Sequence, residues 1–159
     1  MAARHQRDRI LDGAERRAKR QGVGSSVDET CLFLSVLTLA EYDKGIANLA
    51  DDDPRRRRYI AMRDALEAGF DGRILPLGDR AVRRWGEISG RVRRETGHPP
   101  PVIDMLLAAT AMEAGLYLVS RNGKALRHSG AVVFDPWTDD MGAFPLSPLG
   151  RRRRAIDPD

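Results

Sequence analysis

The chain has 159 residues, of which 42% are hydrophobic and 31% charged. This length and balance fit one folded domain with a core of its own. The formal net charge of +4 mildly favours a polyanionic partner without identifying one. The single cysteine, Cys31, excludes an intramolecular disulfide, and no signal peptide or membrane-length apolar run is found. A cytoplasmic protein without membrane contact is therefore expected.

The predicted elements begin after a charged N-terminal segment. Residues 1–26 are rich in Arg, Ala and Gly and carry one short apolar pair, Ile10-Leu11. From residue 27 to residue 137, apolar strands alternate with helices, which predicts one α/β domain with a mainly parallel sheet covered by helices. Residues 138–159 lack hydrophobic periodicity and are expected to form a disordered tail.

The strands and helices of the domain can be placed by periodicity and by their end signals. Strands are predicted at four short apolar runs, residues 32–37, 73–77, 116–119 and 131–134. Helices are predicted between them, at residues 38–49, 54–68 and 79–95, and in an almost wholly apolar segment that ends before Gly115. Asp53-Pro54 reads as an N-cap followed by a proline at the first helical position.

Two carboxylates stand out because each follows a loop or a buried strand near the start of a helix. Asp104 lies in the first turn of the apolar helix, and Glu41 lies early in the helix that follows residues 32–37. Two such acids in one pocket would repel each other unless a cation such as Mg²⁺ or Mn²⁺ lay between them. A simpler interpretation also holds: Thr38 and Glu41 form a capping box, and Asp104 interacts with the helix dipole.

Two runs of arginine, Arg55 to Arg58 and Arg151 to Arg154, hold much of the excess positive charge. They can be read as RNA contacts. They can equally be read as a solvated helix face and part of the tail.

Several motifs, taken together and in their order, resemble the PIN-domain toxins of the VapC type, with the FitB-like branch as the nearest. The resemblance covers residues 27–137. It rests on Leu32-Phe-Leu-Ser-Val-Leu-Thr-Leu-Ala-Glu41 with Lys44-Gly45-Ile46, Arg73-Ile-Leu-Pro-Leu77 with Trp85-Gly86, Pro101-Val-Ile-Asp104 with Leu107-Ala-Ala-Thr110-Ala, Leu118-Val-Ser-Arg-Asn122, and Val133-Phe-Asp-Pro-Trp137.

The resemblance implies a three-layer α/β/α PIN-like domain. It also implies a Mg²⁺- or Mn²⁺-dependent endoribonuclease, the toxin of a type II toxin–antitoxin pair, in which the metal activates the water that cleaves RNA. Its partners would be a VapB-type antitoxin and a second copy of the chain. By the same resemblance, Glu41 and Asp104 are metal-site acids, and Thr38 and Asn122 are supporting polar groups.

Two departures from the family pattern bear on activity. The family begins with an apolar strand at the centre of the sheet that ends in its first metal acid. This chain has Arg9-Ile-Leu-Asp12, so Asp12 is either that acid or an exposed acid on a charged helix. The Arg-rich segment is also compatible with a frameshift or a misassigned start. At the position of the family's fourth acid, the chain has Ala125-Leu126.

These departures leave an alternative function and a structural expectation. The alternative is a catalytically degenerate PIN-like domain that binds an antitoxin or an intact toxin. The structural expectation is that, without the central strand, the predicted strand at residues 116–119 lacks hydrogen-bond partners along one edge, which is costly when the backbone is buried.

Overall fold

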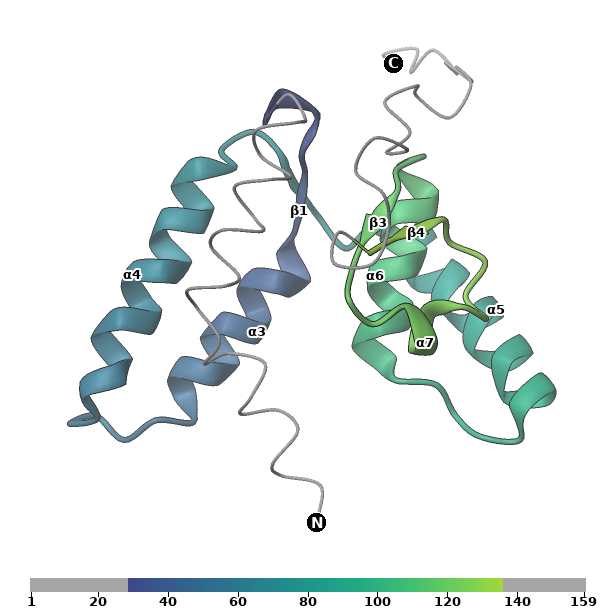
Figure 1. Cartoon of the computed structure of the whole chain (residues 1–159), viewed down its shortest axis with the longest axis horizontal. Helices are drawn as coiled ribbons and strands as arrows, with labels where there is room; N and C mark the ends of the chain where they lie inside the picture. Colours follow the sequence, from purple (N-terminus) through teal and green to yellow (C-terminus); the bar gives the residue numbers. More distant parts are fainter. Residues whose placement is uncertain (1–28, 136–159) are drawn as a thin grey trace.

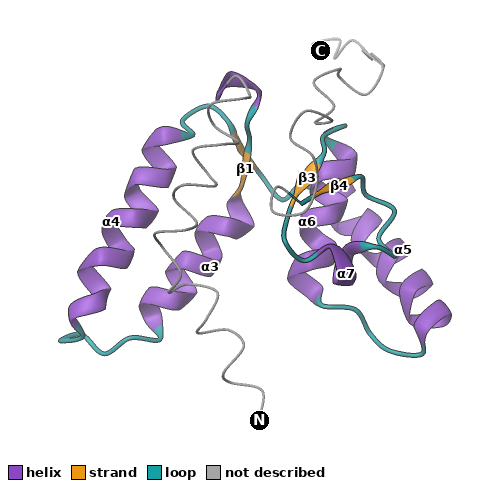
Figure 2. Cartoon of the chain, in the orientation of Figure 1, coloured by secondary structure: helices purple, strands orange, loops and turns teal. Residues whose placement is uncertain are grey.

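The computed structural model describes residues 29–135. The predictions made for residues 1–26, including Asp12, and for the tail at residues 138–159 concern residues that the structure does not describe. Helices make up most of the described chain, and the strands are short (Figures 1 and 2). In chain order the elements are η1 (Glu29–Cys31), β1 (Leu34–Ser35), α3 (Val36–Ala47), α4 (Pro54–Gly69), β2 (Ile74–Leu75), α5 (Asp79–Thr96), α6 (Val102–Glu113), β3 (Leu118–Val119), α7 (Gly123–Leu126) and β4 (Val133–Phe134).

The first half of the described chain is a helical hairpin with one pair of strands. Helices α3 and α4 pack against each other, and β1 pairs with β2 in parallel, Leu34 opposite Ile74. Leu39 and Ile46 are the buried side chains of α3, whereas α4 has no buried residue. This half therefore holds only a thin core.

The second half contains the main hydrophobic core. It is built between α5 and α6, which lie side by side in Figure 1 and make the most extensive helix–helix contact among residues 29–135. Leu118 and Val133, from the two strands of this half, pack against the core. Its buried members are Ile88, Val92, Met105, Ala108, Ala109 and Leu126.

The predicted strands are shorter in the structure, and among residues 29–135 they form two separate pairs. Each strand has two residues, and β3 pairs in parallel with β4 while β1 pairs with β2. In the pair of β3 with β4, the Leu118 amide donates a hydrogen bond to the Val132 carbonyl, and the Ser120 amide donates one to the Phe134 carbonyl. Within residues 29–135, neither β1 nor β3 has a second strand beside it. The residues that would supply a central strand lie outside the described chain, so one-sided pairing at residues 116–119 stays a prediction.

The start of α3 differs from the prediction. The helix begins at Val36 rather than at Thr38, because the Ser35 hydroxyl accepts a hydrogen bond from the Leu37 amide at 3.2 Å and acts as the N-cap. The predicted Thr38–Glu41 capping box is therefore wrong. The N-cap at Asp53 is confirmed, with Pro54 at the first position of α4.

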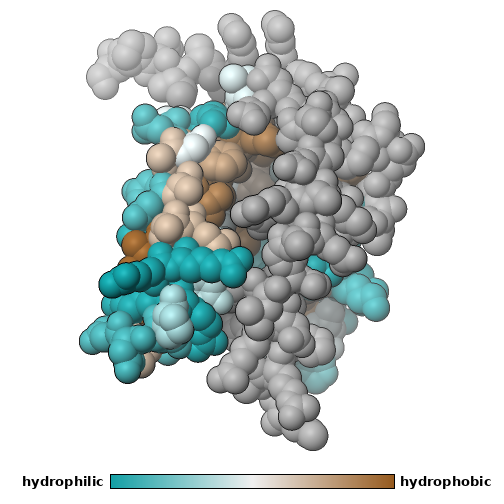
Figure 3. All heavy atoms as spheres, turned by 60° about the vertical axis from the view of Figure 1, so that its left-hand side comes forward, coloured by the Kyte–Doolittle hydropathy of each residue, from teal (hydrophilic) through white to brown (hydrophobic). Residues whose placement is uncertain are grey.

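The exposed surface of the first half is uneven in polarity. Figure 3 brings this side of the molecule forward and shows a band of apolar side chains with hydrophilic residues above and below it. Phe33 and Val36, at the two ends of β1, are among the exposed large apolar residues. No helix within the described ranges is long and apolar enough to cross a membrane.

Loss of a core side chain should test the α5–α6 contact. We expect Met105→Ala to lower the free energy of unfolding by about 2–5 kcal/mol, because Met105 is fully buried and its truncation leaves a cavity. Urea unfolding measures the change. Val102→Ala, at an exposed position of the same helix, is the control and should stay within about 0.5 kcal/mol of wild type. Similar values for the two variants would contradict this account of the core.

The Asp53 cap should give a pH-dependent contribution to stability. Hydrogen bonds from the Arg55 side chain and backbone lower the pKa of Asp53 from its ordinary 3.8 to about 2. A carboxyl with a lowered pKa stabilises the fold above its ordinary pKa, and that contribution is lost as the pH falls through the folded-state pKa. The stability difference between wild type and Asp53→Ala should therefore be full above about pH 4 and shrink towards pH 2.

Urea unfolding over this pH range measures the difference. Asp52→Ala, at the exposed neighbouring position, is the matched control. A difference that does not change with pH would show that Asp53 does not act as a charged cap.

Candidate functional site

The candidate site is centred on Asp104, in the first turn of α6 as predicted. No side chain caps this helix, whose N-cap residue is Pro101. Met105, which follows Asp104, is fully buried, as are Ala108 and Ala109 one turn further along. The buried face of α6 thus fixes the helix, while the Asp104 carboxylate lies in a half-buried position at its start.

Asn122 is brought to Asp104 from 18 residues further along the chain. Its Nδ2 donates a hydrogen bond to Asp104 Oδ2 at 2.6 Å. The backbone of Asn122 is held as well, because its amide donates to the Ser120 hydroxyl and its carbonyl accepts from the Ala125 and Leu126 amides at the start of α7. Two of the residues that the sequence singled out therefore meet at one point.

Glu41 and Thr38 lie on α3, in the other half of the described chain. The Glu41 carboxylate is 3.4 Å from Lys44 Nζ, one turn further along the helix, and is not turned back to the helix start. The ion pair with Lys44 thus gives Glu41 a simple structural role in place of the capping box. Its assignment as a metal-site acid stays a prediction.

The acids do not form a complete metal centre within the described chain. Among residues 29–135, no three His, Cys, Asp or Glu side chains lie close enough together to hold a metal ion. At the fourth-acid position, Ala125 belongs to α7 and Leu126 is buried in the core, so no carboxylate is supplied there. Asp12 lies outside the described residues, and its role is untested.

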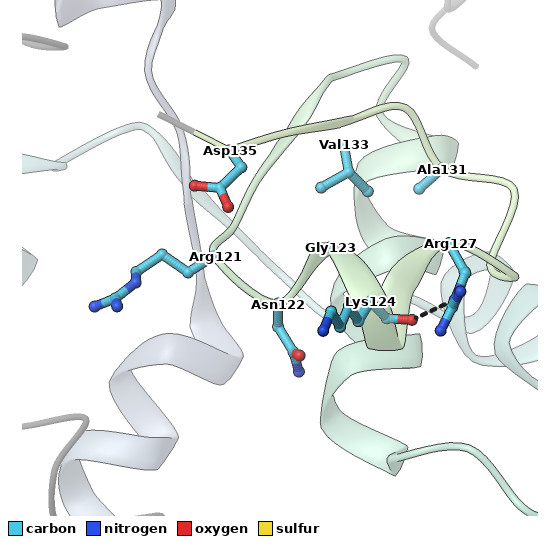
Figure 4. Close-up of a pocket in the computed structure, with 8 residues that line it drawn as sticks. All are labelled: Arg121, Asn122, Gly123, Lys124, Arg127, Ala131, Val133 and Asp135. Atoms are coloured by element: carbon cyan, nitrogen blue, oxygen red, sulfur yellow. Dashed lines mark hydrogen bonds between the residues drawn. The ribbon is translucent and has the colours of Figure 1, made fainter. Parts of the chain in front are cut away.

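A pocket that the sequence analysis did not anticipate lies beside Asn122. Figure 4 shows the loop and helix at residues 121–127 forming one wall of the pocket and residues 131–135 forming the opposite wall. The cavity has a volume of about 580 Å³. It is lined by Arg121, Asn122, Gly123, Lys124, Arg127, Ala131, Val133 and Asp135.

The signal that could have located this pocket is the parallel pairing of β3 and β4. The carboxyl ends of neighbouring parallel strands meet at the same edge, so the residues that follow β3 lie near Asp135, which follows β4. Three of the lining residues are cationic, and Asp135 is the single acid among them.

The first arginine run has partly structural roles. Arg55 pairs with Asp53, and Arg56 donates to the carbonyls of Ile46 and Leu49 at the end of α3. Arg57 and Arg58 are exposed on α4. The second run, Arg151 to Arg154, lies outside the described residues, so RNA contact by either run stays a prediction.

Comparison with known proteins identifies the family. The PIN domain family matches residues 5–130, and the chain belongs to it. Toxin FitB of Neisseria gonorrhoeae is 26% identical over 108 residues, which cover 68% of this chain and 77% of FitB. VapC ribonuclease Y4jK of Sinorhizobium fredii is 26% identical over 110 residues, which cover 67% of this chain and 75% of that protein.

Solved structures agree with this assignment of the fold. A chain in the crystal structure of FitAcB from Neisseria gonorrhoeae matches with a TM-score of 0.65 and 23% identity, over 77% of this chain and 87% of that one. A chain of VapBC-5 from Mycobacterium tuberculosis, of the VapBC family of toxin–antitoxin systems, matches with a TM-score of 0.51 and 26% identity, over 68% and 86%. The helix-rich α/β arrangement with parallel strands is thus that of PIN domains.

A double-mutant cycle should measure the bond between Asp104 and Asn122. We expect Asp104→Ala and Asn122→Ala to be coupled by about 1.5–3 kcal/mol in the free energy of unfolding, because hydrogen bonds to charged groups contribute that much. Urea unfolding of wild type, the two single variants and the double variant gives the coupling. Additive effects, within about 0.5 kcal/mol, would show that the two side chains do not support each other.

Proposed function

We propose that the chain is a divalent-metal-dependent endoribonuclease, the toxin component of a type II toxin–antitoxin pair. The observation that carries the proposal is the contact between Asp104 and Asn122 within a PIN domain. The Asn122 amide nitrogen donates to the Asp104 carboxylate and fixes its orientation, and Mg²⁺ commonly binds through one or two carboxylates while it keeps several waters. The donor atoms therefore suit Mg²⁺ or Mn²⁺.

In this proposal the residues have distinct tasks. Asp104 holds the cation, and Asn122 keeps the Asp104 carboxylate in one orientation through the 2.6 Å hydrogen bond. Glu41 adds a second carboxylate, Thr38 a hydroxyl, and Asp12 a further acid. A bound divalent cation neutralises charge on the scissile phosphate and lowers the pKa of the attacking water.

The proposed partners follow from the relatives. VapBC-5 is described as a member of a toxin–antitoxin family, and another structural neighbour is FitAB bound to a DNA fragment. We extend this to a VapB-type antitoxin that binds this chain in the cytoplasm, and to a homodimer of the chain. RNA is the proposed substrate.

A second candidate function is that of a catalytically degenerate PIN domain, which binds an antitoxin or an intact toxin without cutting RNA. It is favoured by the lack of a three-acid cluster among residues 29–135 and by Ala125 at the fourth-acid position. The two candidates differ in whether the protein binds a divalent cation through Asp104.

Calorimetric titration with Mn²⁺ should separate them. We expect wild type to bind Mn²⁺ and Asp104→Asn to lose at least about tenfold in affinity, since the variant removes the charged ligand. Asp79→Asn is the matched control, because Asp79 also lies in the first turn of a helix, α5, and is exposed. The same proteins should then be tested for RNA cleavage with Mn²⁺ and with EDTA.

The outcomes separate the two functions. Binding and cleavage that both depend on Asp104 would support the nuclease. A folded wild-type protein that binds no Mn²⁺ and cuts no RNA would overturn the nuclease, and pull-down of a co-expressed antitoxin would then test the binding module.

A further inference from the structure

The pocket beside Asn122 is lined by more positive than negative charge. Elsewhere in the described chain, arginines such as Arg63 and Arg84 are paired with carboxylates. Lys124 and Arg127 are exposed, and no ion pair joins either of them to a carboxylate of residues 29–135. Two cations at one pocket without such partners can accept an anionic ligand.

The residues that line the pocket suit a ligand that is partly charged and partly apolar. Arg127 Nε donates to the Lys124 carbonyl at 3.1 Å, which fixes the side chain against α7 and leaves its terminal nitrogens for other acceptors. Ala131 and Val133 form the facing wall and offer apolar surface (Figure 4). A volume of about 580 Å³ is in the range of small-ligand sites, so one nucleotide unit fits.

The position of the pocket ties it to the candidate catalytic centre. Asn122 lines the pocket, and its side chain donates to Asp104. Asn122 therefore links the pocket to Asp104, which is not itself one of the lining residues. A phosphodiester chain has the required repeat of charged and less polar groups.

We propose that Lys124 and Arg127 bind a backbone phosphate of RNA next to the one that is cut. This deepens the proposed nuclease function and rests on it for the identity of the substrate. Lys124 and Arg127 are positioning residues, since they contact a neighbouring phosphate and not the reacting one. Because phosphate contacts carry no base information, the pocket contributes affinity without sequence preference.

Salt-dependent RNA binding tests the proposal without any cleavage. The probe is a short fluorescently labelled single-stranded RNA of mixed sequence, titrated in EDTA and followed by anisotropy over a series of KCl concentrations. We expect Lys124→Gln/Arg127→Gln to bind about tenfold more weakly or worse than wild type. We also expect the slope of log affinity against log salt to become shallower by about 0.7 for each phosphate that the variant no longer neutralises.

Two controls separate the pocket from charge in general and from misfolding. Arg80→Gln/Arg83→Gln makes the same charge change on the exposed surface of α5, at residues that do not line the pocket, and should bind within about threefold of wild type. Lys124→Arg/Arg127→Lys keeps both charges and should retain wild-type slope and most of the affinity. Thermal unfolding by circular dichroism should confirm that all variants are folded.

Each outcome bears on one proposal. Equal loss of affinity in the two Gln double variants, an unchanged slope in the pocket variant, or no RNA binding by wild type would overturn the pocket. RNA cleavage by wild type combined with an unaffected pocket variant would leave the nuclease standing without this site. Binding through the pocket by a protein that never cleaves RNA would leave the phosphate contact standing and refute the nuclease.

Discussion

The contact between α5 and α6 is the constraint on which the candidate site depends. It is close because α6 presents alanines, Ala108 and Ala109, together with the fully buried Met105. Leu118 and Leu126 pack on the same core, so β3 and α7 are placed relative to α6 as well. Asp104 and Asn122 thus meet because the elements that carry them share one core, and burial of apolar surface maintains their 2.6 Å contact.

The first half of the described chain is held less firmly, and this matters for Glu41. Helix α4 has no buried residue, and the strands of the two halves form separate pairs among residues 29–135. In the family pattern a central strand lies between such pairs and carries the first acid. In that pattern, one element both completes the backbone hydrogen bonds of its neighbours and carries a metal-site acid.

The sequence predicted features that depend on neighbouring residues better than those that depend on distant ones. Asp53-Pro54 and the first-turn position of Asp104 were predicted correctly because caps and prolines act locally. The capping box failed because two hydroxyls, Ser35 and Thr38, could start the same helix, and strand pairing decided between them. The pocket at Lys124 was missed since α7 is too short for periodicity. The family resemblance implied that Asp104 and Asn122 belong to one site, but their direct hydrogen bond was not predicted.

The location of these groups also separates binding from catalysis. The basic pocket and the Asp104–Asn122 contact belong to the half with the main core, whereas Glu41 belongs to the other half. The pocket that we propose to bind RNA is lined by residues 121–135 of that half alone. The proposed metal site also needs Glu41 from the other half. The two proposals therefore place different demands on the structure, because phosphate binding requires one half of the described chain and the metal site requires both.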